Sequence, residues 1–62
     1  MFDFSETEDK IYAMGMYKFT YGFFDLIRNS IRNCEELRLD WAAQTRSVDD
    51  IRMRCDFLIT QF

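Results

Sequence analysis

The residues of this chain that could perform chemistry are few, because the sequence contains no histidine. Without histidine the commonest general base is absent, and neither cysteine can form a Cys–His pair. Ser5, Ser30 and Ser47 occupy positions typical of helix caps rather than of nucleophiles beside a base. Carboxylates adjoin at 35–36 and 49–50, but adjacent residues point to different faces of a helix. The sequence therefore predicts no enzyme and no small-molecule substrate.

Metal and cofactor sites find equally little support. A structural zinc site needs about four Cys, His or carboxylate ligands at short spacing, whereas Cys34 and Cys55 stand far apart in the sequence. Gly15 and Gly22 match neither phosphate-binding motif. We therefore expect no cofactor and no metal. The two cysteines are interpreted as small buried hydrophobic residues, or as a disulfide if their helices cross at that point.

The charge pattern bears on nucleic acid as a partner. The chain has a net charge of −3, and its first nine residues carry four acids and no base. Arg28 and Arg32 lie one helical turn apart and are the candidate phosphate contacts, yet each contact must compete with an acidic whole. We therefore do not expect nucleic acid as a partner. A DNA-binding transcriptional regulator is the alternative.

Helices must position all of these residues. Ser5 and Glu8 have the spacing of a capping box, which predicts a helix from residue 6. Apolar residues then recur with helical spacing as far as Trp41, so the segment 6–44 is either one helix or two helices broken near 29–33, where Asn and Ser are poor helix formers. Ser47 with Asp50 begins a second predicted helix over 48–60. A strand over 17–21 would have no partner strand.

The N-terminal half of the first helix is apolar on a second side. Gly15 and Gly22 there indicate either a close approach of backbones or tolerated surface positions. The helix over 48–60 is too short to cover this half as well. Two all-α architectures satisfy the pattern, a three-helix bundle and a helical hairpin that dimerises, and we favour the hairpin. The predicted protein-interaction residues are Tyr12, Met14, Met16, Tyr17, Phe19, Tyr21 and Phe24.

The segments 5–16 and 20–33 resemble small early proteins of lambdoid phages, encoded between the exonuclease and excisionase genes. The resemblance covers most of the chain but includes no catalytic or binding motif, so it transfers no functional residue. It implies an accessory factor that acts in the host cytoplasm and biases infection toward lytic growth by engaging host regulation.

Together these observations predict a single small helical domain over 1–62 that works as a protein-interaction module. We expect a homodimer that binds an unidentified host protein and favours lytic development. The expected location is the cytoplasm, because two cysteines without a secretory signal or a dense cysteine framework indicate a reducing compartment. We also expect no transmembrane segment.

Overall fold

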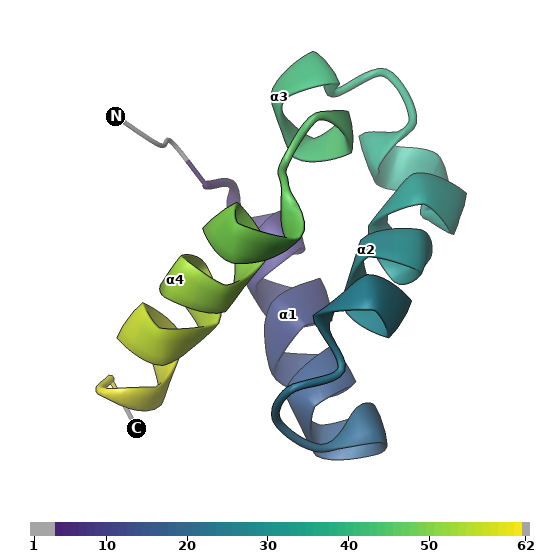
Figure 1. Cartoon of the computed structure of the whole chain (residues 1–62). Coiled ribbons are helices and arrows are strands. Elements are labelled where there is room, and N and C mark those ends of the chain that lie inside the picture. The colour runs from purple at the N-terminus through teal and green to yellow at the C-terminus, as the bar shows by residue number, and fades with distance from the viewer. Residues whose placement is uncertain (1–3, 62) are drawn as a thin grey trace.

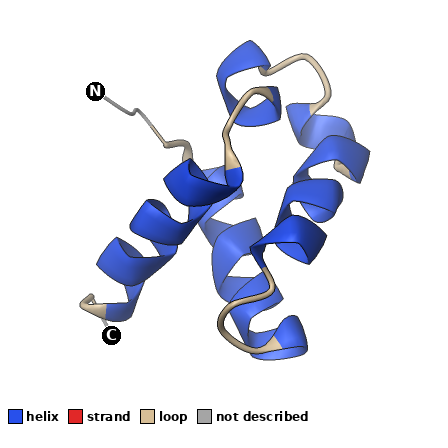
Figure 2. Cartoon of the chain, viewed as in Figure 1, coloured by secondary structure: helices blue, strands red, loops and turns tan. Residues whose placement is uncertain are grey.

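The computed structural model describes residues 4–61, and these residues form helices joined by short loops (Figures 1 and 2). No strand occurs among them, so the predicted all-α helical fold is confirmed. The elements, in chain order, are α1 (Glu6–Phe19), α2 (Phe24–Asn33), the short 3-10 helix η1 (Glu35–Leu37), α3 (Trp41–Gln44) and α4 (Val48–Ile59).

Capping boxes begin the two longest helices. The Ser5 hydroxyl accepts from the Glu8 backbone N–H at 3.1 Å, and the Glu8 carboxylate accepts from the Ser5 N–H at 3.3 Å. Ser47 and Asp50 make the same exchange at the start of α4, at 3.0 and 3.1 Å. Both predicted helix starts are therefore confirmed, because each depends on residues only three positions apart.

The chain does not form the long helix expected over 6–44. It turns at 20–23, where Thr20 has φ 65° and Gly22 has φ 110°, so both residues leave the right-handed helical region. Glycine accepts such a φ without the steric cost that a Cβ would add. A second boundary does fall in the expected region, since α2 ends at Asn33. The result has three main helices, as in the three-helix alternative and unlike the favoured hairpin, but its first break lies at 20–23 and not near 29–33.

Helices α1, α2 and α4 surround the hydrophobic core, with α2 and α4 packed against α1 and against each other (Figure 1). A Cβ built at Gly15 would lie 2.5 Å from Ile27 Cγ1, so the glycine permits α1 and α2 to approach closely. This is the close approach that the sequence suggested for Gly15, whereas Gly22 serves the turn. The buried hydrophobic residues are Tyr12, Phe24, Ile27, Ile31, Leu37, Ala43, Ile51, Cys55 and Leu58.

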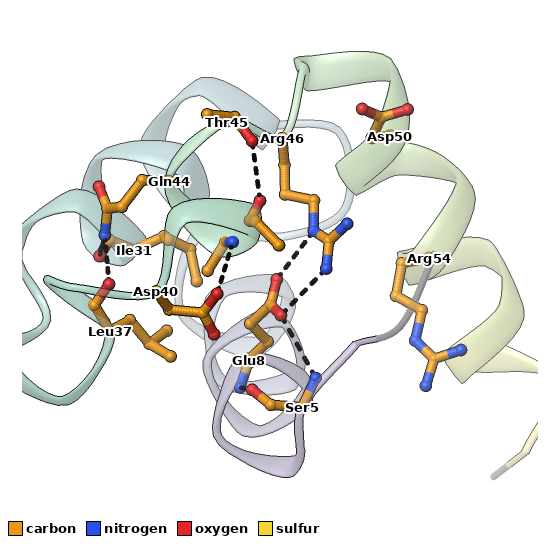
Figure 3. A network of polar contacts seen from close by, with 12 residues as sticks. Ser5, Glu8, Ile31, Leu37, Asp40, Gln44, Thr45, Arg46, Asp50 and Arg54 are labelled. Carbon is orange, nitrogen blue, oxygen red and sulfur yellow. Dashed lines mark hydrogen bonds and ion pairs between the residues drawn. The ribbon is translucent and has the colours of Figure 1, made fainter. Parts of the chain in front are cut away.

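A buried ion pair joins the start of α1 to the loop before α4 (Figure 3). Arg46 donates through Nε and Nη2 to the Glu8 carboxylate at 3.1 and 3.3 Å. The Tyr12 hydroxyl donates to the same carboxylate at 2.9 Å. The pKa of Tyr12 is raised well above its ordinary value, mainly by burial and secondly by the negative charge of Glu8. The Arg46 guanidinium carbon lies over the Phe4 ring, 4.1 Å from the centre of that ring. One carboxylate therefore joins two segments of the chain, the start of α1 and the loop before α4.

The connection between α2 and α4 is held by polar contacts to backbone groups (Figure 3). The Gln44 amide donates to the carbonyl oxygens of Ile31 and Leu37 at 3.2 and 2.8 Å, and Asp40 caps α3 by accepting from a backbone N–H. Trp41 was expected on the buried stripe, but its side chain is 78% exposed because α3 is a separate turn with its own orientation.

Cys55 is buried, Cys34 is half-buried, and both are reduced. Their placement agrees with the interpretation as small hydrophobic residues. Among residues 4–61, no group of Cys, Asp or Glu side chains has the arrangement to hold a metal ion. None of the helices in that range has the length and apolarity needed to cross a bilayer.

Candidate nucleic-acid interface

Most basic side chains of the chain are neutralised by neighbouring carboxylates. Exposed pairs join Lys10 to Glu6 and Arg38 to Glu35. The remaining pairs are those of Arg46 with Glu8, Arg52 with Asp49 and Asp56, and Arg54 with Asp9. An anion such as a phosphate would have to displace an internal carboxylate to reach any of these five cations.

Three basic residues differ, because Lys18, Arg28 and Arg32 have no ion pair with any carboxylate among residues 4–61. Lys18 lies in the last turn of α1, with its ammonium group 5.4 Å from the centre of the Phe19 ring. Arg28 and Arg32 lie on α2, four residues and about 6 Å of helix rise apart. The uncompensated positive charge is thus concentrated on α2 and the end of α1.

The outer face of α2 also carries hydrogen-bonding side chains beside the two arginines. Asn29 and Asn33 are exposed, and each directly follows one of the arginines. The outer side of α2 therefore carries a polar stripe made of two Arg-Asn pairs, 28–29 and 32–33, one helical turn apart. It lies opposite the buried Ile27 and Ile31. We call the four residues of this stripe the α2 face, and Lys18, in the last turn of α1, is a third unpaired cation outside it. Guanidinium and carboxamide groups are the side chains that bond most readily to phosphates and base edges.

Arg28 has a further property within this face. Its Nε atom is buried and has no hydrogen-bond partner among the described residues, while the side chain as a whole is only half-buried. An unpaired buried donor costs about 1–3 kcal/mol. The Arg28 Nε–H is therefore a hydrogen-bond donor that the described residues leave unused.

One carboxylate lies on the same helix. Asp25 is exposed in the first turn of α2, three residues before Arg28, and it also stabilises the positive end of the helix. The charge along α2 is therefore distributed unevenly, with the acid at the N-terminal end and Arg32 in the last turn. The positive charge of α2 therefore lies in the C-terminal two-thirds of the helix.

The structure separates the residues that the sequence grouped as a protein-interaction surface. Tyr12 and Phe24 are core residues, and Met16 and Phe19 are half-buried against the core. The exposed members are Met14, Tyr17 and Tyr21. Met14 and Tyr17 line an open apolar hollow of about 640 Å³ beside Lys18 and Ser30. The turn at 20–23 is the cause, because it folds α2 over the face that a continuous helix would have left uncovered.

The two candidate phosphate contacts, Arg28 and Arg32, do lie on one face, as their spacing predicts. Sequence reasoning missed Asn29 and Asn33, which it interpreted only as poor helix formers near a break. The repeat of Arg-Asn at 28–29 and 32–33 was the available signal, since residues four apart share a helix face. Ser30, expected at a cap, lies inside α2 and donates to the Leu26 carbonyl at 3.1 Å.

The sequence model of the SLIDE family matches residues 1–62. The chain belongs to the SLIDE family. SLIDE domains are SANT-like DNA-binding domains of chromatin remodelers. No solved structure matches the chain.

Membership of the SLIDE family corrects two expectations. The hypothesis of a protein-interaction module that binds a host protein and favours lytic development is wrong, because the family is one of DNA-binding domains. The expectation that nucleic acid is not a partner is wrong for the same reason. The first error came from the apolar second side of the predicted long helix and from the phage resemblance, and the second came from weighing the net charge of the chain instead of the pairing of individual side chains. The resemblance to early phage proteins stays a prediction.

Proposed function

We propose that this SLIDE-family chain binds duplex DNA. The observation that carries the proposal is the match of the SLIDE model to residues 1–62, since that family consists of DNA-binding domains. The best supported of the alternatives raised by the sequence is therefore the DNA-binding regulator. Binding, rather than catalysis, is the activity proposed.

The α2 face is the surface proposed to contact DNA. Its two arginines, and Lys18 at the end of α1, are uncompensated, so they attract phosphates without first breaking an ion pair. Neutralising phosphates releases condensed counterions, and this release provides most of the affinity of non-specific DNA binding. An α-helix also fits the major groove of B-DNA, which is about 12 Å wide.

The side chains of the α2 face and Lys18 divide into two roles. Lys18 and Arg32 are exposed and suit phosphate contacts, which position a protein on the duplex. Asn29 and Asn33 offer both donors and acceptors and suit either the backbone or a base edge. Arg28 gains a partner for its buried Nε–H when its guanidinium meets an external acceptor.

The test is fluorescence anisotropy with a labelled duplex of about 20 base pairs, titrated with the full chain at several salt concentrations. Three phosphate contacts predict that log K falls with log [salt] with a slope of about −2.7. The affinity should therefore fall about 40-fold between about 50 and about 200 mM salt.

Variants assign the surface. Arg28→Ala combined with Arg32→Ala should reduce the slope to about −0.9, because one contact remains. Arg38→Ala is the matched control, since Arg38 is an exposed arginine already paired with Glu35 at 3.5 Å, and it should leave the slope unchanged. A folded wild-type chain that gives no anisotropy change at about 50 mM salt would refute the proposed function.

A further inference from the structure

The outer face of α4 carries a cation that is held on both sides. The Arg52 guanidinium donates through Nε and Nη2 to Asp49 Oδ1, at 3.2 and 3.1 Å. It also donates through Nη1 to Asp56 Oδ2 at 3.1 Å. All three nitrogens of Arg52 are thus hydrogen-bonded to carboxylates of its own helix, and hydrogen bonding to Asp49 raises the pKa of Arg52 further.

This arrangement has two carboxylates for one guanidinium, so its net charge is negative. It is also fixed from a second element, because the Tyr21 hydroxyl donates to the other oxygen of Asp56. Tyr21 lies in the turn between α1 and α2, and its ring packs edge-on against Phe24 at 5.3 Å between centroids. We call Asp49, Arg52 and Asp56 the α4 clamp.

The other basic residue of α4 points away from solvent. Arg54 donates to both oxygens of Asp9 on α1, at 2.9 and 2.8 Å. Its guanidinium lies 4.8 Å from the centre of the Phe4 ring and 4.5 Å from that of Phe57. Both cations of α4 are therefore engaged within the molecule, in contrast to the two arginines of α2.

In three-helix DNA-binding domains of the homeodomain type, the last helix enters the major groove. Here α4 is the last of the three main helices, and it packs against both α1 and α2. A phosphate approaching the exposed turns of α4 would meet the excess carboxylate of the clamp. Electrostatics therefore directs DNA to α2 and not to α4.

We propose that Asp49 and Asp56 determine which helix contacts DNA, by holding Arg52 and keeping α4 off the duplex. This inference rests on the proposed DNA binding and adds the choice of helix to it. It also predicts that the clamp conceals one further cation, Arg52, which becomes available to a phosphate once the two carboxylates are neutralised.

The experiment compares four forms of the full chain in the anisotropy assay: wild type, Arg52→Ala, Asp49→Asn with Asp56→Asn, and the triple variant. Asparagine keeps the size of aspartate and one of its two acceptor oxygens while removing the charge, and far-UV circular dichroism checks that each form is folded. Arg52→Ala alone should leave the wild-type affinity within about twofold. The double Asn variant should bind more tightly, with a slope steeper by about 0.9, because Arg52 becomes one more phosphate contact.

The triple variant separates a specific contact from a general change in charge. Adding Arg52→Ala to the double Asn variant should remove the extra slope. If the extra slope persists, or if Arg52→Ala weakens wild-type binding as much as Arg32→Ala does, the inference is overturned. Failure of the proposed function is distinguishable. A wild type that does not bind while the double Asn variant does would refute DNA binding by the natural chain and support the masking of α4. No binding by either form would overturn both.

Discussion

The buried carboxylate of Glu8 offers the most demanding test of how this small domain is stabilised. Its side chain is 1% exposed and that of Arg46 is 7% exposed, so the pair is shielded from water. Four hydrogen bonds reach the carboxylate, from the Ser5 N–H, the Tyr12 hydroxyl and two Arg46 nitrogens. Glu8→Ala leaves all of these donors without their acceptor and Arg46 with a buried charge.

The expected cost follows from these contacts. Removing one partner of a buried ion pair costs about 3–5 kcal/mol, because the other charge stays buried without compensation. A domain of 62 residues has a free energy of unfolding of about 3–9 kcal/mol at typical values per residue. Glu8→Ala therefore removes a large fraction of the free energy of unfolding. If the wild-type value lies at the lower end of its range, the variant is unfolded at 25 °C.

Urea denaturation followed by circular dichroism at 222 nm measures this loss. With an m-value of about 1 kcal/mol/M for so small a domain, the midpoint should fall by about 3 M or more. Glu6→Ala is the control, because Glu6 occupies the same first turn but makes only an exposed pair with Lys10, and it should shift the midpoint by less than about 0.5 M.

A second variant separates the charge from the position. Replacing both partners, with Glu8→Leu and Arg46→Met, should recover most of the stability, since apolar groups of similar size carry no desolvation cost. A Glu8→Ala midpoint within about 0.5 M of the wild type would refute the reasoning. It would mean that the Arg46 guanidinium finds solvent or another acceptor at little cost.

Three further outcomes follow from the packing. Gly15→Ala should lower the free energy of unfolding by about 1–2 kcal/mol in urea titrations, because the clash with Ile27 exceeds the gain in helix propensity. Gly22→Ala should lower it by a similar amount, because alanine is strained at the positive φ of this position. Burial raises the pKa of Cys55 to about 11, so the folded state retains the thiol proton more tightly than the unfolded state does. The free energy of unfolding should therefore fall by about 2–3 kcal/mol between pH 9 and 11. In Cys55→Ala it should fall less steeply. With a thiol reagent at pH 8, Cys34 should react within minutes and Cys55 only on unfolding, and equal rates would contradict the burial.

The helix starts were predictable because their signals are local. Each capping box lies within four consecutive residues, so no knowledge of the rest of the fold is needed. The turn at 20–23 was not predictable in the same way. Thr20 is β-branched and takes a φ of 65° that such residues rarely adopt, so its conformation is imposed by the packing of α2 on α1. That packing depends on Gly15 meeting Ile27, a contact between separate helices.

The ion pairs between distant residues could not be predicted from the sequence for a related reason. Glu8 and Arg46 are 38 positions apart, and Asp9 and Arg54 are 45 apart. Only the folded chain shows which carboxylate neutralises which base. The spacing of Arg28 and Arg32 did predict a shared helix face, but it could not show that these two arginines are the ones without internal partners.

Net charge was for this reason the wrong quantity on which to exclude DNA. The chain carries 11 acids and 8 bases, yet a bound phosphate responds mainly to charges within a Debye length, about 8 Å at physiological salt. The molecule measures 28 × 24 × 18 Å, so much of its acidic surface lies beyond that distance from the α2 face. Many of the acids are also occupied by internal bases. What decides whether DNA is attracted is the local excess of unpaired cations, and the described residues provide that excess on α2 while the α4 clamp provides the opposite sign.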